Sequence, residues 1–375
     1  MKKKIVFITG TRADYGKLKS LMKAVESHDS FELFVFVCGM HLQRVFGGTY
    51  HEVLNDRYKN LYVAHGLVHS DHMSVNLGNT ISHMTGYFET MRPDMIVVHG
   101  DRIDALAGAI VGALNNITVA HIEGGEVSGT IDESIRHAVS KFAHLHFVSN
   151  EESKKRIIQL GENAENIFDV GSPDIDVMLS ENLPQLDEVK KHYGFSYDSY
   201  GIAMYHPVTT EHAEIGKNIK VLVDALIESE RKFVVIYPNN DLGSEIILNE
   251  YKRFEGNENM VLYPSMRFEY FVTLLKNAEC IIGNSSAGIR ESGVYGIPAI
   301  NVGTRQNGRY HLESFKNLQQ VGENVEEILS ALENVSKYQI VQMNFGKGDS
   351  TNKFMDIIAN KKVWERTLQK KFIDM

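Results

Sequence analysis

The stretch DMIVVHGDRIDALAGAIVGALNNITVAHIEGG, residues 94–125, decides the fold that this sequence predicts. It begins with a short apolar run, continues as a helical pattern of small residues over 105–116, and ends in a second apolar run. Both runs are continuous rather than alternating, which is typical of strands buried on both faces of a parallel sheet. The stretch therefore predicts a β–α–β unit, from which doubly wound α/β domains are built.

The same alternation of strands and helices extends along the chain in both directions. Strands are expected at 3–10, 31–39, 94–100, 116–125, 145–150, 200–207, 232–239, 259–265, 279–284 and 297–303. Helices are expected at 14–27, 105–116, 218–229, 268–278, 286–296 and 354–372. The segment 171–188, which contains Pro173 and Pro184, interrupts this rhythm and is the candidate linker.

These elements predict an α/β protein with two Rossmann-like doubly wound parallel-sheet domains that face a central cleft. The N-terminal domain is expected over 1–175 and is completed by the C-terminal helix at 355–375. The C-terminal domain is expected over 176–354, and we expect it to bind a nucleotide. Open α/β sheets bind ligands beyond the carboxyl ends of their strands, so polar residues at the strand ends are the candidates for function.

Composition limits the function. The chain has 375 residues, too many for one ordinary core, and its net charge of −9 argues against nucleic acid or an anionic membrane as a partner. Cys38 and Cys280 lie inside apolar runs, which indicates buried free thiols in a reduced, cytoplasmic protein. The sequence predicts neither a signal peptide nor a membrane-spanning segment.

Two carboxylates follow the two strands of the opening stretch. Asp101 comes directly after the first strand and a glycine, and Glu123 comes at the end of the second. Asp104 suits the N-cap of the intervening helix, which leaves Asp101 to face the ligand. Carboxylates that share a site shift each other's pKa, so that one can hold a proton while the other accepts one. The pair predicts acid/base chemistry.

The following loop, GGEVSGTIDE, adds more acids. Thr130 and Glu133 have the spacing of a capping box, which explains Glu133 without chemistry. Asp132 is not needed for that cap and is the better catalytic candidate, whereas Glu126 has no assigned role. A metal site formed by His121, Glu123, Glu126 and His137 is disfavoured because these residues lack H-E-x-x-H spacing. The spacing of His65, His69 and His72 is more suggestive, but in a chain with sixteen histidines such a cluster is more often structural or incidental. No metal and no cofactor are expected.

Two cations lie in the first strand-to-helix turn, which reads GTRADYGK over residues 10–17. The turn lacks the G-x-G-x-x-G dinucleotide fingerprint. Arg12 and Lys17 nevertheless stand where backbone N–H groups and the helix dipole favour an anion. In the alternative interpretation, Thr11 and Asp14 cap the helix and both cations are solvated.

The second half offers further partners for a phosphate. His206 follows a strand and precedes a proline, as a proton donor, a phosphate ligand or an ordinary loop histidine. Arg305 and Arg309 follow the last expected strand and would clamp a diphosphate.

The segment GNSSAGIRESG predicts a nucleotide pocket in the same half. Ser285, Ser286 and Gly288 are small enough for a ligand to approach the backbone at the start of a helix. Glu291 stands one turn later, where it can accept hydrogen bonds from both ribose hydroxyls. The alternative is that Ser286 serves only as an N-cap.

Together, the motifs TGTRADYGKL, HGDRIDALAGA, HIEGGEVSGTIDESIRH, YHPVTTE, GNSSAGIRESG and NVGTRQNGR resemble the hydrolysing UDP-N-acetylglucosamine 2-epimerases of sialic-acid biosynthesis. The resemblance covers nearly the whole chain and implies the GT-B-type fold. It also implies that UDP is released with inversion at carbon 2, giving free N-acetylmannosamine through a 2-acetamidoglucal.

The resemblance assigns roles by position. It implies three catalytic carboxylates and a histidine, Asp101, Glu123, Asp132 and His206. It implies substrate contacts by Arg12, Arg102, Ser285, Ser286 and Glu291, to which the positions of Lys17, Gly288 and Arg305 in their turns add three further candidates. Glu133 is a departure, because some members carry Asp there. The expected partner is a UDP-sugar, and the expected assembly is a homodimer or a dimer of dimers.

Other functions stay open at this point. The same chemistry could act on UDP-2,4-diacetamido-2,4,6-trideoxyglucose, as used toward legionaminic acid. A GT-B glycosyltransferase would explain the nucleotide pocket but not three carboxylates around one loop. A non-hydrolysing epimerase would yield UDP-N-acetylmannosamine, and a silent nucleotide-sugar sensor would bind without turnover.

Overall fold

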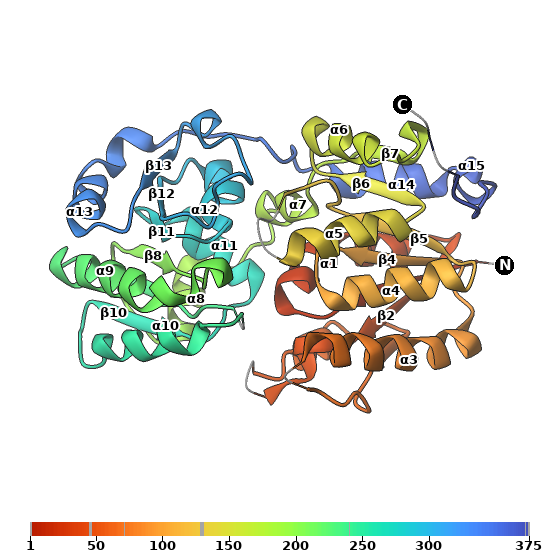
Figure 1. Ribbon diagram of the computed structural model, residues 1–375, viewed down its shortest axis with the longest axis horizontal. Coiled ribbons are helices and arrows are strands. Elements are labelled where there is room, and N and C mark those ends of the chain that lie inside the picture. Colours follow the sequence, from red (N-terminus) through yellow and green to blue (C-terminus); the bar gives the residue numbers. More distant parts are fainter. Residues whose placement is uncertain are drawn as a thin grey trace. The chain divides into compact units, whose positions relative to one another are not determined.

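A computed structural model describes residues 2–44, 47–70, 72–127, 131–239, 241–371 and 373. The described chain forms two compact units (Figure 1). The first consists of residues up to Glu126, Ile131–Leu179 and the segment from Phe345 onward, and the second contains Val127 and Ser180–Asn344. The units thus divide at 179/180 and 344/345, close to the 175/176 and 354/355 boundaries expected from the sequence.

The first unit is built on a parallel sheet. Over its described residues, seven strands lie in the order β3-β2-β1-β4-β5-β6-β7. Their bounds are β1 (Lys3–Thr9), β2 (Phe31–Val37), β3 (Leu61–Val63), β4 (Met95–His99), β5 (Thr118–Ile122), β6 (Leu145–Val148) and β7 (Ile167–Asp169). The strand order reverses between β1 and β4. The loops that follow these two strands therefore diverge, which is where ligands bind to open α/β sheets.

Helices cover both faces of this sheet (Figure 1). They are α1 (Arg12–Ser27), α2 (Tyr50–Asn55), α3 (Met73–Met91), α4 (Ile103–Leu114), α5 (Ile131–Phe142), α6 (Glu151–Gln159), α7 (Pro173–Met178), α14 (Ser350–Ala359) and α15 (Lys361–Trp364). Alternate residues of β1 explain the two layers. Ile5 and Phe7 pack in a core with α1 and α14, whereas Val6 and Ile8 pack in a core with α3 and α4. Every one of these β1 side chains is buried, as the continuous apolar run predicts.

The second unit repeats the plan. Over its described residues, six parallel strands lie in the order β10-β9-β8-β11-β12-β13, with the reversal between β8 and β11. The strands are β8 (Gly201–Met204), β9 (Phe233–Ile236), β10 (Met260–Tyr263), β11 (Ile281–Gly283), β12 (Ala299–Val302) and β13 (Leu318–Val321). The helices are α8 (Leu186–Tyr193), α9 (Ile215–Glu228), α10 (Ser244–Tyr251), α11 (Phe268–Lys276), α12 (Ala287–Arg290) and α13 (Val325–Glu333). The predicted pair of Rossmann-like parallel-sheet domains is confirmed.

Two helix predictions were wrong. The helix expected over 286–296 is only the four residues of α12, followed by a 3₁₀ turn at Ser292–Tyr295. The helix expected over 354–372 ends at Ala359, because the Asn360 side chain accepts a hydrogen bond from the Lys362 N–H and starts the short α15. Beyond Trp364, the described chain is not helical. No helix within the described ranges has the length and apolar character needed to cross a membrane.

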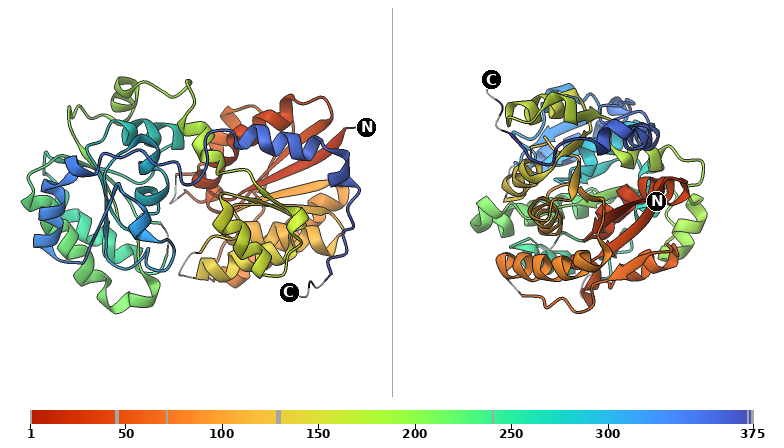
Figure 2. Two further views of the ribbon diagram at one scale, coloured as in Figure 1. Left: turned by 90° about the horizontal axis from the view of Figure 1, so that it is seen from above. Right: turned by 90° about the vertical axis from the view of Figure 1, so that its right-hand side faces the viewer.

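The C-terminal segment is tied to the first unit. Helix α14 lies beside α1, with Phe354 and Ile358 fully buried (Figure 2). Farther on, Lys370 Nζ lies 2.6 Å from Glu162 Oε2 and 2.6 Å from the carbonyl oxygen of Ala143, just beyond α5. A lysine donates well to the free carbonyl groups at the C-terminal end of a helix, so the tail closes α5 at that end.

Glu162 makes this contact sensitive to pH. Burial alone would raise the pKa of Glu162, but hydrogen bonds from His146, Lys141 and Lys370 outweigh burial and lower the pKa from 4.5 to about 2. A carboxyl whose folded-state pKa is lowered stabilises the protein above its unfolded pKa, and this contribution is lost as pH falls through the folded pKa. We therefore expect up to about 3 kcal/mol of the free energy of unfolding to be lost between about pH 4.5 and 2.

Urea unfolding at several pH values tests this expectation. Glu162→Gln should flatten the pH dependence within that window. The exposed Glu165 lies three residues away, and Glu165→Gln is the control that should leave the slope of the wild type unchanged. An unaltered slope in Glu162→Gln would contradict the assignment.

Candidate active site

One buried arginine connects the ends of β4 and β5. Arg136, on α5, is 5% exposed. Its Nη2 is hydrogen-bonded to Asp101 Oδ2, and its Nη1 donates to the carbonyl oxygen of Glu123 at 2.7 Å. Asp101 follows Gly100, whose φ of +68° turns the chain sharply after β4. The guanidinium therefore fixes Asp101 and the Glu123 backbone with respect to each other.

Glu123 itself is held in an unfavourable backbone conformation. Its φ is +62°, and the residue is 4% exposed. Ser172 Oγ donates to Glu123 Oε1, and His99 Nε2 lies 3.1 Å from Oε2. Left-handed backbone at a residue other than glycine costs about 1–3 kcal/mol and concentrates at functional sites. The sequence placed Glu123 at a strand end, and the structure adds that the residue is buried and strained, while its part in acid/base chemistry stays a prediction.

Lys17 lies between two buried carboxylates. Its Nζ is 2.9 Å from Asp174 Oδ2 and 4.0 Å from Glu123 Oε2. Asp174 is completely buried. The alternative interpretation of a solvated cation is therefore wrong for Lys17, whose charge offsets those of Glu123 and Asp174. The predicted contact of Lys17 with an anionic ligand stays a prediction.

The first turn also has its predicted cap. Thr11 accepts a hydrogen bond from the Asp14 N–H, and Asp14 accepts one from the Thr11 N–H, so the capping box is confirmed. Arg12 begins α1 and is hydrogen-bonded through Nη2 to Glu52. A ligand phosphate at Arg12 would thus share the guanidinium with a carboxylate.

The N-cap assignment of Asp104 was wrong. Arg102 occupies the N-cap of α4, with extended backbone and no side-chain cap. Asp104 lies inside the first turn, 6% exposed, with Cys38 Sγ 3.5 Å from its Oδ1. Burial raises the pKa of Asp104 to about 6. The Asp104 side chain packs against Gly10, Gly39 and Cys38, and these tertiary contacts are not visible in the local sequence.

His121 supports the Asp101 turn and is not arranged as a metal ligand. Its Nε2 lies 2.8 Å from the carbonyl oxygen of Gly100, and its Nδ1 lies 3.1 Å from Ser140 Oγ. Burial lowers the pKa of His121 to about 3, so the ring is neutral and donates from Nε2. Among the residues that the structure describes, no three His, Cys, Asp or Glu side chains form a potential metal site.

The remaining acids of the loop differ in their surroundings. Asp132 is half-buried in the first turn of α5. Glu133 Oε1 lies 3.4 Å from His137 Nε2, and its predicted capping partner, Thr130, lies outside the described residues. Glu126, which had no assigned role, is buried and accepts a hydrogen bond of 2.6 Å from Ser149 Oγ. Glu126 thus has a structural explanation.

In the second unit, one asparagine connects the two strands at which the strand order reverses. Asn284 follows β11 and is 1% exposed. Its Oδ1 accepts from the His206 N–H at 2.7 Å, and its Nδ2 donates to the His206 carbonyl at 2.8 Å. The carbonyl oxygen of Asn284 accepts from Arg305 Nη1 at 3.2 Å and from Gln306 Nε2 at 2.7 Å. Three loops predicted to contact a nucleotide therefore meet at Asn284.

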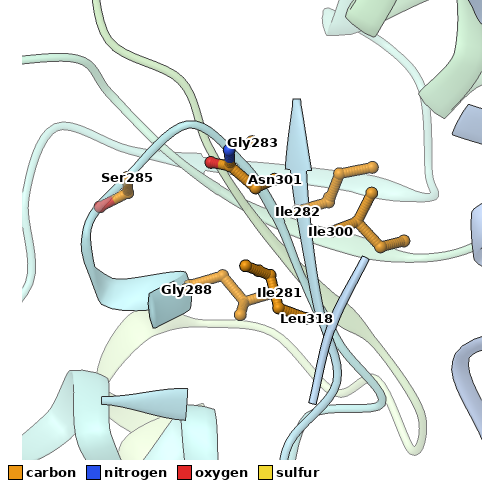
Figure 3. Close-up of a pocket in the computed structure, with 8 residues that line it drawn as sticks. All are labelled: Ile281, Ile282, Gly283, Ser285, Gly288, Ile300, Asn301 and Leu318. Atoms are coloured by element: carbon orange, nitrogen blue, oxygen red, sulfur yellow. The ribbon is translucent and has the colours of Figure 1, made fainter. Parts of the chain in front are cut away.

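The predicted nucleotide segment forms a tight loop around a small pocket. Gly283 has a φ of +130°, and a Cβ there would lie 2.0 Å from the carbonyl oxygen of Met204, so only glycine fits. The pocket has a volume of about 10 Å³, which is space for about one water molecule. Its lining consists of Ile281, Ile282, Gly283, Ser285, Gly288, Ile300, Asn301 and Leu318 (Figure 3).

The residues around this pocket alter how a phosphate could be bound at the segment that was predicted to hold a nucleotide. Ser285 Oγ accepts from the Ala287 N–H at 3.3 Å, whereas Ser286 occupies the N-cap without a side-chain cap bond. The alternative that Ser286 serves only as a helix cap is therefore not supported. Because α12 has four residues, a helix dipole contributes little, and backbone N–H groups of the loop would have to bind the phosphate. Glu291 is 5% exposed.

Arg309, the second proposed diphosphate clamp, has a backbone partner. It is 9% exposed, and its Nε donates to the carbonyl oxygen of Val127, which belongs to the same unit, at 3.0 Å. Arg305 is the better placed of the two, because it borders Asn284 at the reversal of strand order.

Comparison with known proteins gives this arrangement a family. A family model described as UDP-N-acetylglucosamine 2-epimerase matches residues 23–359. The UDP-N-acetylglucosamine 2-epimerase of Neisseria meningitidis is 44% identical over 376 residues, covering 100% of this chain and 99% of that protein. The chain belongs to the UDP-N-acetylglucosamine 2-epimerase family.

Other members of the family are similar over the same length. The UDP-N,N′-diacetylbacillosamine 2-epimerase (hydrolyzing) of Legionella pneumophila is 32% identical and covers 99% of each chain. The structure of the Methanocaldococcus jannaschii UDP-GlcNAc 2-epimerase, solved with UDP-GlcNAc and UDP, aligns with a TM-score of 0.81 at 22% identity. The alignment covers 95% of this chain and 99% of the Methanocaldococcus protein, and it shows that the two proteins have the same fold. The family resemblance found in the sequence is confirmed.

Sequence reasoning missed several residues of this 2-epimerase that surround the predicted site. Ser172 and Asp174 lie in the segment that was interpreted as a linker because of its prolines. Arg136 lies in the third position of the motif SIRH, on the interior of an expected helix. Asn284 stands directly after a strand and beside Ser285, a position that could have identified it.

Proposed function

We propose that this chain is a hydrolysing UDP-N-acetylglucosamine 2-epimerase, which converts UDP-N-acetylglucosamine and water to UDP and free N-acetylmannosamine. The observation that carries the proposal is the fixed pair of strand-end acids: Asp101 and the strained Glu123, both held by Arg136. The Neisseria and Legionella relatives support it, the first by its name and 44% identity, the second by the word hydrolyzing in its name.

The proposed reaction is an anti elimination followed by hydration. A carboxylate removes the proton at carbon 2 while the bond from carbon 1 to the UDP oxygen breaks, which leaves a 2-acetamidoglucal and UDP. Water then adds its oxygen to carbon 1, and a proton is delivered to carbon 2 from the opposite face. These two steps give the manno configuration, and together they consume one water molecule for each UDP-sugar that is converted.

We assign the acid/base steps to the first unit. Asp132 acts as base or acid at carbon 2, Asp101 is its partner in the hydration, and Glu123 orients the sugar or these acids. The surroundings support this division, because Glu123 is enclosed by Ser172, His99 and Lys17, whereas Asp101 and Asp132 are only partly buried. An enclosed carboxylate suits positioning, and more accessible ones suit proton transfer.

We assign the leaving group to the second unit. Ser285, Ser286, Gly288 and Glu291 would hold the nucleoside, and Arg305 with His206 would meet the charge that develops on the diphosphate. Such donors act mainly in the transition state, when the UDP oxygen acquires charge.

A second candidate substrate is favoured by one observation. The Legionella relative, 32% identical over 99% of each chain, is named for UDP-N,N′-diacetylbacillosamine, a 2,4-diacetamido-2,4,6-trideoxy sugar. The same elimination and hydration would proceed on that sugar, because both reacting carbons are unchanged. The choice depends on the groups that meet carbons 4 and 6.

One assay separates these functions. The enzyme is incubated in heavy water with each UDP-sugar, and products are followed by NMR. We expect UDP and free N-acetylmannosamine with one deuterium at carbon 2. Formation of UDP-N-acetylmannosamine without release of UDP would show a non-hydrolysing epimerase, and turnover of only the diacetamido sugar would show the second candidate. A product without deuterium at carbon 2 would disprove the elimination.

A further inference from the structure

The loops after β8 and β11 start at the point where the strand order of the second sheet reverses. Loops at such a point run apart. The Asn284 N–H donates to the Met204 carbonyl at the end of β8 at 3.1 Å, and the Asn284 side chain extends this connection to the loop beyond β8. Asn284 uses its carbonyl oxygen for the His206 N–H and its amide nitrogen for the His206 carbonyl. Because both bonds have backbone partners of fixed polarity, the orientation of the Asn284 amide is determined as well.

A second contact determines which nitrogen of His206 carries the proton. The N–H of Asn239, in the loop after β9, lies 3.0 Å from His206 Nδ1. A backbone N–H can only donate, so Nδ1 must be the acceptor, and the proton of the neutral ring is on Nε2. Protonation of Nδ1 would set two donors against each other. In this geometry, the neutral His206 ring carries its hydrogen on Nε2, and Nδ1 is occupied as an acceptor.

We propose that Asn284 is a positioning residue that holds His206 as an Nε2–H donor for an anionic oxygen of the nucleoside diphosphate. The proposal rests on the proposed function, in which that diphosphate is the leaving UDP. Asn284 holds the backbone of His206 against the Asn239 N–H, so the loss of its side chain frees both the position of the ring and its tautomer.

The same residue would couple this donor to the diphosphate clamp. Its backbone carbonyl accepts from Arg305 Nη1 and Gln306 Nε2, at 3.2 and 2.7 Å. These bonds do not involve the side chain, so an alanine at this position removes the bonds to His206 and retains those to Arg305 and Gln306. The side-chain role can therefore be tested separately from the backbone role.

The test compares the full-length wild type with two variants, Asn284→Ala and the isosteric Asn284→Asp. Asn317 provides a matched control: it is completely buried in the same unit, and its Nδ2 donates to Ser292 Oγ and to the Ile297 carbonyl, both at 2.9 Å. Asn317→Ala also removes two buried amide bonds, and neither of them has His206 as a partner. Two quantities are measured: the His206 tautomer by ¹⁵N-histidine NMR without ligand, and the Kd of UDP by calorimetry.

In the wild type, the NMR signals of His206, assigned with a His206→Gln variant, should show a single Nε2–H tautomer. Asn284→Ala should show both tautomers and bind UDP about tenfold more weakly or worse. Asn284→Asp keeps the acceptor for the His206 N–H and should lose less affinity for UDP. If the alanine variant does not fold, the aspartate variant provides the result. Asn317→Ala should lower stability while the tautomer and the Kd of UDP stay as in the wild type.

The proposal is overturned if both Asn284 variants keep the wild-type tautomer and Kd, or if Asn317→Ala changes both as strongly as Asn284→Ala does. Failure of the proposed function gives a different pattern. In that case, the wild type releases no UDP from the UDP-sugars, while the tautomer and the binding of UDP still respond to Asn284.

Discussion

Asp101→Asn is expected to lower kcat for UDP release by about three orders of magnitude, with the Kd of UDP changed less than about threefold. Positioned acid/base groups contribute about 10²–10⁴-fold to rates, and an amide cannot exchange the proton. The amide keeps the size of the carboxylate and an oxygen for Arg136, so the local structure should persist. A coupled assay of UDP release gives kcat, and calorimetry gives the Kd.

A neighbouring acid provides the control for this prediction. Glu126 is a buried carboxylate in the loop after β5, three residues from Glu123, and it is bonded to Ser149. Glu126→Gln should retain kcat within about fivefold, because an amide can keep this kind of bond. If Asp101→Asn retained kcat within tenfold, Asp101 would have no part in the chemistry. If kcat fell equally in Glu126→Gln, the loss in Asp101→Asn would not identify Asp101 as a catalytic group.

Arg136→Met is expected to have an effect of similar size on kcat and a larger one on stability. The substitution removes the guanidinium from Asp101 and from the Glu123 carbonyl. Loss of one partner from a buried ion pair costs about 3–5 kcal/mol, because the remaining charge stays poorly solvated. We expect kcat to fall by about 10³-fold and the free energy of unfolding to fall by about 3 kcal/mol, measured by urea denaturation.

Two further variants separate charge from geometry. Arg136→Lys keeps the positive charge but not the planar fork that reaches two acceptors, so it should recover part of the stability and little of kcat. Arg253, on the surface of the second unit, pairs with Asp224 and Glu250, and Arg253→Met should cost less than about 1 kcal/mol. Full activity in Arg136→Lys would show that the fork has no role in positioning Asp101.

The sequence predicted the strands that coincide with an uninterrupted apolar run and missed β3, β7 and β13, most of whose residues are not buried. Runs such as 94–100 are apolar without interruption because both faces of the strand are covered, and that pattern is local. In contrast, β3 has three residues, all of them only half-buried. Helix α3 was missed because only Thr80, Met84, Phe88 and Met91 of its nineteen residues are buried, a weak stripe within polar sequence.

The residues of the candidate site also differ in how far the sequence predicted them. Asp101 and Glu123 were predictable, because the end of a parallel strand is a position that the sequence marks. Their partners were not, because tertiary packing brings them together: Arg136 lies 35 residues from Asp101, and Ser172 lies 49 residues from Glu123. Prolines near Ser172 indicated a linker, whereas Pro173 in fact starts α7, the helix position that proline tolerates best.

The return of the chain to its first unit has a consequence for biosynthesis. Phe354 and Ile358 of α14 complete the core against α1, yet the ribosome adds them only after the whole second unit. At about 5–20 residues per second, the early half would wait roughly 10–30 s with that apolar surface uncovered. The second unit is nearly continuous in sequence and can close first. Translation from N- to C-terminus thus completes the two halves in reverse order, and the nascent early half is the natural client for a chaperone.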